Sequence, residues 1–209
     1  SVAELADMMR MLEDQGAHNI NLVTATHFAH LLPEAITKAK LHIPVVYNCG
    51  GYEKLEVIQS LEGLIDIYLP DLKYYSSELS GKFSGASDYF EKAAAAILEM
   101  IRQTGKAEYD SDGMMQKGVI IRHLVLPGHR EDSMRILDWI KECVPEDVRI
   151  SLMRQYTPGK EKLPYPELNR RLTSFEYDKV AEYTEKPARQ AGNGVRLAGF
   201  YSFTKTMND

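Results

Sequence analysis

The stretch Val119-Ile-Ile-Arg-His-Leu-Val-Leu126, followed by Pro127-Gly128, decides the fold class of this chain. An apolar run of this length that ends at Pro-Gly predicts a strand buried on both faces, as in a parallel sheet. Shorter runs of the same kind lie at residues 20–23, 43–47, 64–69 and 148–153. Five strands are therefore expected.

Segments with helical spacing of apolar residues separate these strands. Helices are expected at residues 29–40, 52–61, 87–104 and 131–143, and Thr173 with Glu176 caps a last one that runs to about residue 185. Residues 74–85 are predicted to be a polar loop, and residues 105–117 a surface excursion rich in Asp and Gly. Strict alternation of strands and helices predicts an α/β protein with parallel strands and right-handed crossovers.

Composition narrows the class of protein. The chain has 209 residues, 44% of them hydrophobic, which is ample for a buried core. Its formal net charge of −5 argues against a nucleic-acid partner, which needs a basic surface. Without an apolar run of the ~20 residues that cross a bilayer, we expect no membrane association and a cytoplasmic location. Cys49 and Cys143 are too few for a disulfide framework and are expected to be reduced.

The chain begins half a unit into the alternation. Ser1 and Glu4 form a capping-box pattern, which predicts an initial helix up to Gly16. Because a first helix needs a sheet to pack on, we expect at least one strand upstream of Ser1 in a longer protein. Residues 1–186 are expected to form the domain, and residues 187–209 an irregular tail.

Polar residues follow the predicted strands. In parallel α/β sheets and barrels, ligands bind at the carboxyl ends of the strands. The residues that converge there are Thr24, Thr26 and His27, then Asn48 and Cys49, then Asp71 and Lys73, and last Gln155 and Tyr156. Cys49 would be reactive only if a cation or a helix N-terminus lowered its pKa, and otherwise it packs in the core.

Arg122 is the most informative single residue, because burial of a guanidinium inside a strand costs free energy unless the group is paired or binds a ligand. Two kinds of partner for Arg122 are possible: Asp71 from a neighbouring strand, or a carboxylate or phosphate of a ligand. His123 faces the opposite way and is expected to be a core histidine. His27 and His30 lack a third residue at metal-ligand spacing, so no metal site is predicted.

Four segments together resemble a known family: His18-Asn-Ile-Asn-Leu-Val-Thr-Ala-Thr-His27, Tyr68-Leu-Pro-Asp-Leu-Lys73, Ile121-Arg-His-Leu-Val-Leu-Pro-Gly128 and Ile150-Ser-Leu-Met-Arg-Gln-Tyr-Thr-Pro158. They are similar to the radical S-adenosylmethionine proteins related to pyruvate formate-lyase activating enzyme. The resemblance implies a parallel, partial TIM-type (β/α)6 barrel, with five of its six strands in this chain and the first missing.

The resemblance also implies cofactors and site residues. Such proteins bind S-adenosylmethionine and a [4Fe-4S] cluster held by C-x-x-x-C-x-x-C after the first strand, a motif that this chain lacks. It places Thr24, Thr26, Asn48, Asp71, Lys73, Arg122 and Gln155 at the cofactor. Thr24 to His27 replace a Gly-Gly-Glu turn of the family, and Asn48 with Cys49 replaces an Asp-Thr pair. Lys73 is similar to a lysine that meets the cofactor's carboxylate.

The leading hypothesis is the C-terminal part of a radical S-adenosylmethionine enzyme that makes a 5′-deoxyadenosyl radical for hydrogen abstraction. Its cluster ligands are expected upstream, so the fragment by itself is expected to be inactive. The resemblance implies a glycyl radical enzyme or another protein or peptide as substrate, and flavodoxin or ferredoxin as electron donor. One alternative is a barrel aldolase with Lys73 as the Schiff-base nucleophile, activated by Arg122. Another is a noncatalytic domain whose open sheet edge binds a partner.

Overall fold

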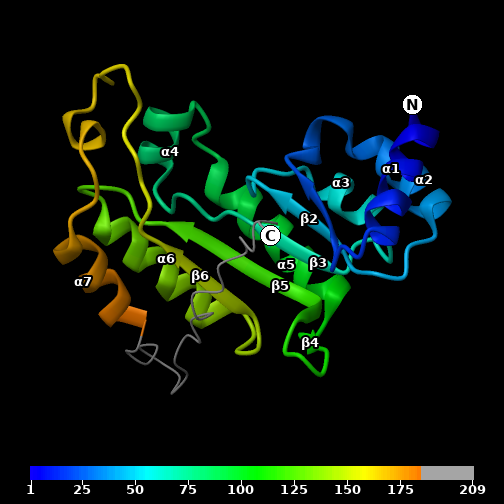
Figure 1. The fold of residues 1–209 in the computed structure, drawn as a ribbon. Helices are drawn as coiled ribbons and strands as arrows, with labels where there is room; N and C mark the ends of the chain where they lie inside the picture. The colour runs from blue at the N-terminus through cyan, green and yellow to red at the C-terminus, as the bar shows by residue number, and fades with distance from the viewer. Residues whose placement is uncertain (185–209) are drawn as a thin grey trace.

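The computed structural model of the chain describes residues 1–184 and consists of a mostly parallel sheet with flanking helices (Figure 1). The sheet has six strands in the order β1-β2-β3-β5-β4, with β6 on β5. Figure 1 shows α1 and α2 together at one end of the sheet and α6 and α7 at the other. The strands are β1 (Ile20–Val23), β2 (Val45–Cys49), β3 (Ile67–Pro70), β4 (Glu108–Tyr109), β5 (Met115–Leu124) and β6 (Arg149–Met153).

The described residues also form seven α-helices and two 3-10 helices. They are α1 (Val2–Asp14), η1 (Ala25–Leu31), α2 (Leu32–Ala39), α3 (Leu55–Ser60), α4 (Ser77–Ser84), α5 (Tyr89–Thr104), α6 (Arg130–Cys143), η2 (Pro166–Asn169) and α7 (Ser174–Thr184). Of these, α1 precedes β1, and η2 and α7 follow β6. The capping box predicted for Ser1 and Glu4 is present at the start of α1. The predicted irregular tail, residues 187–209, lies outside the described residues.

The predicted parallel strands are confirmed, with one addition. β1, β2, β3, β5 and β6 pair in parallel, each with its neighbour in that order. The predicted surface excursion instead contains β4, which pairs antiparallel with the first part of β5. The sheet therefore has six strands where five were expected. A short hairpin was not predicted because its two-residue strand, Glu108 and Tyr109, is exposed and carries no apolar pattern.

Two helix predictions need correction. Residues 29–40 do not form one helix, since η1 with a kink at Phe28 precedes α2. Pro33 is not the break itself, because it lies in the first turn of α2, where its missing N–H needs no partner. The break is at Phe28, whose φ of −127° is not helical. The predicted polar loop at residues 74–85 contains α4, capped by the Ser76 side chain, which accepts from the Leu79 N–H, and ended at Gly85 in the left-handed conformation.

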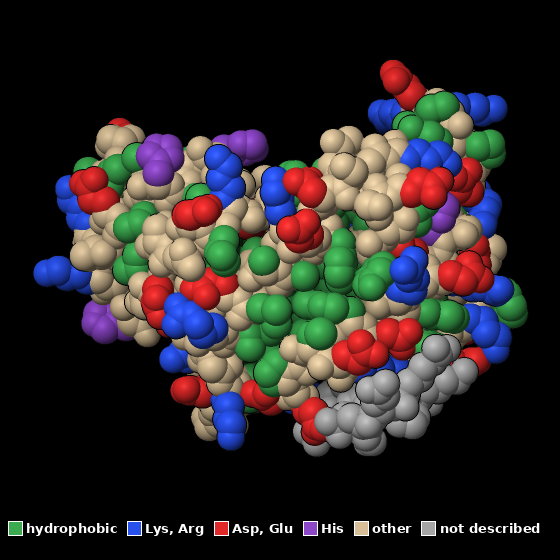
Figure 2. Space-filling view, turned by 180° about the vertical axis from the view of Figure 1, so that it is seen from behind, with side chains coloured by type: hydrophobic (Ala, Val, Ile, Leu, Met, Phe, Trp, Pro, Cys, Tyr) green, Lys and Arg blue, Asp and Glu red, His purple; other side chains and the backbone are tan. Residues whose placement is uncertain are grey.

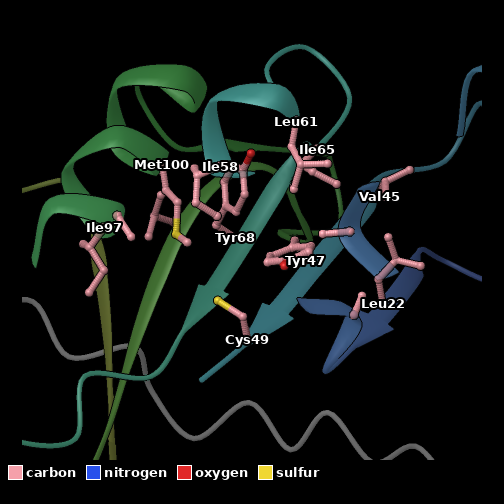
Figure 3. Packing of buried hydrophobic residues seen from close by; sticks show 14 of the residues in the cluster. Leu22, Val45, Tyr47, Cys49, Ile58, Leu61, Ile65, Tyr68, Ile97 and Met100 are labelled. Carbon is pink, nitrogen blue, oxygen red and sulfur yellow. The ribbon is translucent and has the colours of Figure 1, made fainter. Parts of the chain in front are cut away.

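The main core lies between the sheet and the helices that cover one of its faces. Figure 3 shows Tyr47 and Tyr68 rising from β2 and β3 toward α3 and α5, where Ile58, Ile97 and Met100 meet them. The two tyrosine rings pack edge to face with centroids 6.1 Å apart. Each large apolar side chain that is fully buried here contributes roughly 1.5–3 kcal/mol to folding.

The opposite face of the sheet has its own smaller apolar cluster. Val46, Ile67 and Leu69 are buried on this face and pack with Met115 and Ile120. Because side chains alternate along a strand, Asn48 and Arg122 also point to this face, whereas Cys49 and His123 point to the helices. This alternation separates the residues of the candidate site from those of the core.

The outer surface carries charges of both signs. Figure 2, seen from behind, shows apolar side chains gathered at the middle of that face, with acidic and basic side chains around them. Among residues 1–184, no helix is both long and apolar enough to pass through a lipid bilayer.

Candidate functional site at the carboxyl ends of the strands

Asp71, Lys73 and Arg122 form the centre of the candidate site. Asp71 directly follows β3 and pairs with Arg122 of β5 through a parallel bridge. Arg122 Nη2 lies 2.6 Å from Asp71 Oδ1, and Lys73 Nζ lies 3.3 Å from Asp71 Oδ2. One carboxylate therefore lies between two cations, and the group carries a net positive charge.

The ion pair leaves hydrogen-bonding capacity unused. Asp71 Oδ1 and Arg122 Nε are buried and have no hydrogen-bond partner among residues 1–184, although the two side chains touch as an ion pair. An unpaired buried N–H costs about 1–3 kcal/mol. The Arg122 side chain remains 25% exposed and that of Lys73 42% exposed, so both cations are open to a ligand. The pairing with Asp71 thus does not exclude the second partner considered for Arg122, a carboxylate or phosphate.

The backbone that carries Lys73 is held from several sides. The Leu72 N–H donates to Arg122 O, at 2.8 Å. The Leu72 carbonyl lies 2.7 Å from His123 Nδ1, and His123 Nε2 lies 2.8 Å from Ser133 Oγ. Because burial lowers the pKa of His123, the neutral ring donates from Nδ1 to the carbonyl and accepts at Nε2. His123 is thus a core histidine, in the position expected, and it supports the segment beneath the site.

The start of α4 is fixed by a carboxylate from α6. Asp132 is buried, and its two oxygens accept from the N–H groups of Tyr75 and Ser76 at 2.9 and 2.8 Å. This contact fixes the start of a segment that sequence patterns predict to be a loop. It explains why α4 forms despite having few apolar residues.

Thr24 and Thr26 follow the end of β1, and Asn48 lies near the end of the neighbouring strand β2. Thr24 adopts the left-handed conformation, with φ of 55°, and donates its N–H to Asn48 O at 2.9 Å. Thr26 instead donates its hydroxyl to Glu53 Oε1 at 2.8 Å. Asn48 is half-buried and belongs to β2. The sequence had placed it in a turn after the strand. Thr24 and Asn48 are thus adjacent, whereas Thr26 is engaged with a neighbouring carboxylate.

Glu53 was not predicted. It is only 4% exposed and binds the Thr26 hydroxyl at 2.8 Å and the Tyr47 hydroxyl at 3.4 Å. It links η1, after β1, to the end of β2. Its sequence surroundings, Tyr52 and Lys54, are polar and gave no indication of burial.

Cys49 does not belong to the candidate site. It is 2% exposed and packs in the core on the helix-facing side, as its sulfur in Figure 3 shows. Burial raises the pKa of its thiol, and the neighbouring carboxylates Glu53 and Asp71 raise it further. Cys143 is exposed at the end of α6. Of the two possibilities for Cys49, packing is therefore the one realised.

The residues after β6 lie apart from the charged centre. Gln155 is exposed, and its carbonyl accepts from the Thr157 hydroxyl at 3.4 Å. Tyr156 donates its hydroxyl to Leu168 O at 2.8 Å and so anchors η2. No contact within the described part of the chain brings Gln155 to Asp71 or Lys73, so its role in binding stays a prediction.

The donor set does not suit an iron–sulfur cluster. Among residues 1–184, no group of three or more His, Cys, Asp or Glu side chains is placed to hold a metal. Cluster ligation requires several thiolates, and the two cysteines lie in different surroundings with one thiol held neutral. The charged centre, in contrast, suits a ligand that carries a carboxylate.

Comparisons with known proteins bear on the fold. No protein-family model matches the chain. An uncharacterized protein of Methanocaldococcus jannaschii is 32% identical over 186 residues, which is 88% of this chain and 50% of that protein. The chain therefore spans about half the length of this curated relative.

A solved structure shares the architecture. A domain of pyruvate-formate lyase-activating enzyme from Bacteroides vulgatus matches with a TM-score of 0.52 and 12% identity, over 87% of this chain and 98% of that domain. At this identity the match shows a common fold. The α/β sheet described above is thus compatible with the partial barrel that the resemblance implied.

Proposed function

We propose that this chain is the part of a radical S-adenosylmethionine enzyme that holds S-adenosylmethionine. One observation carries the proposal: the Asp71 carboxylate lies between Arg122 and Lys73, at the carboxyl ends of parallel strands in a fold shared with an activating-enzyme domain. This is the edge of a parallel α/β sheet where ligands bind.

The side chains at this edge suit the amino-acid end of the cofactor. Lys73 and Arg122 would bind its carboxylate, and Arg122 Nε is a donor for which residues 1–184 supply no acceptor. Asp71 would keep both cations oriented and neutralise one of them. Thr24 and Asn48, next to each other at the ends of β1 and β2, would contact the same ligand from the side.

The cluster would come from another part of the full protein. β1 is an edge strand of the described sheet. Ile20 donates its N–H to Pro44, just before β2, and Thr24 donates to Asn48 of β2, so the N–H groups of Asn21 and Val23 point away from β2. Val23 is 61% exposed at that edge. A further parallel strand carrying C-x-x-x-C-x-x-C could pair there, in agreement with the greater length of the relative.

In the full protein, the bound cofactors would supply a 5′-deoxyadenosyl radical for hydrogen abstraction from a protein, peptide or other substrate. The residues of this chain would bind and orient S-adenosylmethionine. By itself the 209-residue chain would have no turnover.

The test is calorimetric titration of the chain with S-adenosylmethionine. We expect saturable binding that is lost in Lys73→Ala and retained in Lys92→Ala, which removes an ammonium of α5 that pairs with Asp88 just before that helix. No binding by the wild-type chain would refute the proposal and favour a noncatalytic interaction domain. Two further results would also contradict it: a stable [4Fe-4S] spectrum after reconstitution with iron and sulfide, or trapping of a carbonyl compound on Lys73 by borohydride.

The aldolase hypothesis required Arg122 to act on Lys73. Asp71 lies between the two side chains instead, with Oδ2 3.3 Å from Lys73 Nζ. Lys73 Nζ is thus engaged in an ion pair with Asp71, whereas a Schiff-base nucleophile must be a free amine.

A further inference from the structure

The hydroxyl of Tyr89 lies where the ends of β2 and β3 meet. It accepts the Lys73 N–H at 3.0 Å, and its single O–H proton is shared between two carbonyl oxygens, Asp71 O at 2.9 Å and Gly50 O at 3.0 Å. One side-chain oxygen from α5 thus contacts three backbone groups of two separate segments. Two of those groups belong to the charged residues of the candidate site.

The hydroxyl remains a donor under all ordinary conditions. The ring is only 4% exposed. Burial raises the pKa of the Tyr89 hydroxyl, and the negative charge of the nearby Asp71 carboxylate raises it further. A neutral phenol is both donor and acceptor, which the three contacts require. A phenolate has no proton and could not donate to either carbonyl.

Packing fixes the ring that carries this hydroxyl. Tyr52 stacks on Tyr89 with centroids 5.9 Å apart, and Tyr74 meets it edge on at 5.5 Å. Gly51 lets the segments approach, since a Cβ there would lie 3.2 Å from the Tyr89 hydroxyl and 1.9 Å from Asp71 O. The position of the oxygen is therefore set by its surroundings.

The contacts of Tyr89 reach the charged side chains through the backbone. Asp71 and Lys73 flank Leu72, whose N–H and carbonyl are held by Arg122 and His123. Tyr89 holds the Asp71 carbonyl and the Lys73 N–H on either side of that residue. The hydroxyl thereby limits how the Asp71 carboxylate is directed toward Arg122 and how the Lys73 ammonium is directed toward Asp71.

We propose that Tyr89 is a positioning residue for the binding of a carboxylate ligand at Asp71, Lys73 and Arg122. The proposal rests on the proposed function for the identity of that ligand, S-adenosylmethionine. Tyr89 itself would not touch the ligand. Its hydroxyl would hold the backbone so that Lys73 meets the carboxylate in one orientation, which reduces the entropy lost on binding.

A matched control is available in Tyr68. Its ring is also buried, and its hydroxyl donates to Gln103 Oε1 at 2.6 Å on the helix-facing side of the sheet. Tyr68→Phe and Tyr89→Phe each remove one hydroxyl from a buried ring. Only the second removes a contact with the backbone of Asp71 and Lys73.

The experiment compares both variants with the wild-type chain in two measurements. The first is calorimetric titration with S-adenosylmethionine, and the second is amide hydrogen exchange followed by NMR. For Tyr89→Phe we expect binding about tenfold weaker and faster exchange at Lys73, with unchanged protection in β2 and α5. For Tyr68→Phe we expect wild-type affinity and wild-type exchange at Lys73.

Equal loss of affinity in the two variants would overturn the proposal, because it would indicate a general loss of stability. Loss of protection throughout the chain in Tyr89→Phe would overturn it for the same reason. If the wild-type chain binds no S-adenosylmethionine, the proposed function fails. Exchange at Lys73 then decides by itself whether Tyr89 holds this backbone: unchanged exchange refutes that role, and faster exchange confined to the segment supports it.

Discussion

The contact between Gly51 and Asp71 leads to a sharp prediction for Gly51→Ala. Gly51 has φ of 81°, and an added Cβ would lie 1.9 Å from Asp71 O, a backbone atom that cannot rotate away. The left-handed conformation costs an alanine roughly 1–2 kcal/mol. Displacement of packed backbone adds about 1–3 kcal/mol. We therefore expect a total loss of about 2–5 kcal/mol.

Gly63→Ala is the control that separates these two costs. Gly63 has φ of 76°, nearly the same conformation, but no atom of the described residues 1–184 lies within 4 Å of an added Cβ. The control should lose only the conformational part, about 1–2 kcal/mol. Both substitutions restrict the unfolded chain equally, so that effect cancels in the comparison.

Urea unfolding followed by circular dichroism measures the difference. Gly51→Ala should unfold at a clearly lower urea concentration than Gly63→Ala, with similar slopes, because the surface exposed on unfolding is the same. In thermal unfolding, the extra 1–3 kcal/mol corresponds to a midpoint lower by about 2–4 °C for each kcal/mol. Equal midpoints for the two variants would show that β2 and β3 do not approach as closely as described.

Three further predictions concern pH and charge. Burial lowers the pKa of His123, so the unfolded chain takes up a proton first as the pH falls below the ordinary value of 6.5. Stability should then decrease by up to ~1.4 kcal/mol per pH unit, and His123→Gln should show a shallower slope in urea titrations between pH 7 and 5. The hydrogen bonds of Arg170 lower the pKa of Glu176, whose carboxylate is 12% exposed. Glu176→Gln should lose about 1–3 kcal/mol at pH 7, and this deficit should shrink as the pH falls below the ordinary value of 4.5; a deficit that persists in acid would contradict the assignment. Arg122→Met should weaken S-adenosylmethionine binding at least about tenfold, whereas Arg135→Met, which removes a guanidinium stacked on Tyr75, should not; equal effects in the two titrations would remove Arg122 from the site.

Local patterns predicted most of the parallel framework. β1 occupies the predicted residues 20–23, and β6 begins one residue after its predicted start. These strands were recognisable as short apolar runs, which are a local property of the sequence, although in the structure each alternates buried with more exposed residues. The capping box at Ser1 is local in the same sense, since its two partners are three residues apart.

Elements that depend on distant contacts were not predicted. α4 has few apolar residues and is held at its start by Asp132, which is more than 50 residues away in the sequence. β4 exists because the first part of β5 offers it a partner. Neither partner can be recognised before the chain is folded.

The candidate site likewise has features that local sequence predicts and features that depend on contacts between distant segments. The sequence by itself determined the residue types at the strand ends, including the Asp71-Leu72-Lys73 stretch and a buried strand that contains an arginine. Only the tertiary structure decided that Arg122 pairs with Asp71, that Cys49 faces the helices, and that Tyr89 contacts the backbone on either side of Leu72. Composition and spacing along the chain determine which groups a strand can offer. Which of them meet within about 3 Å depends on strand register and side-chain packing, which arise only when segments distant in sequence come together.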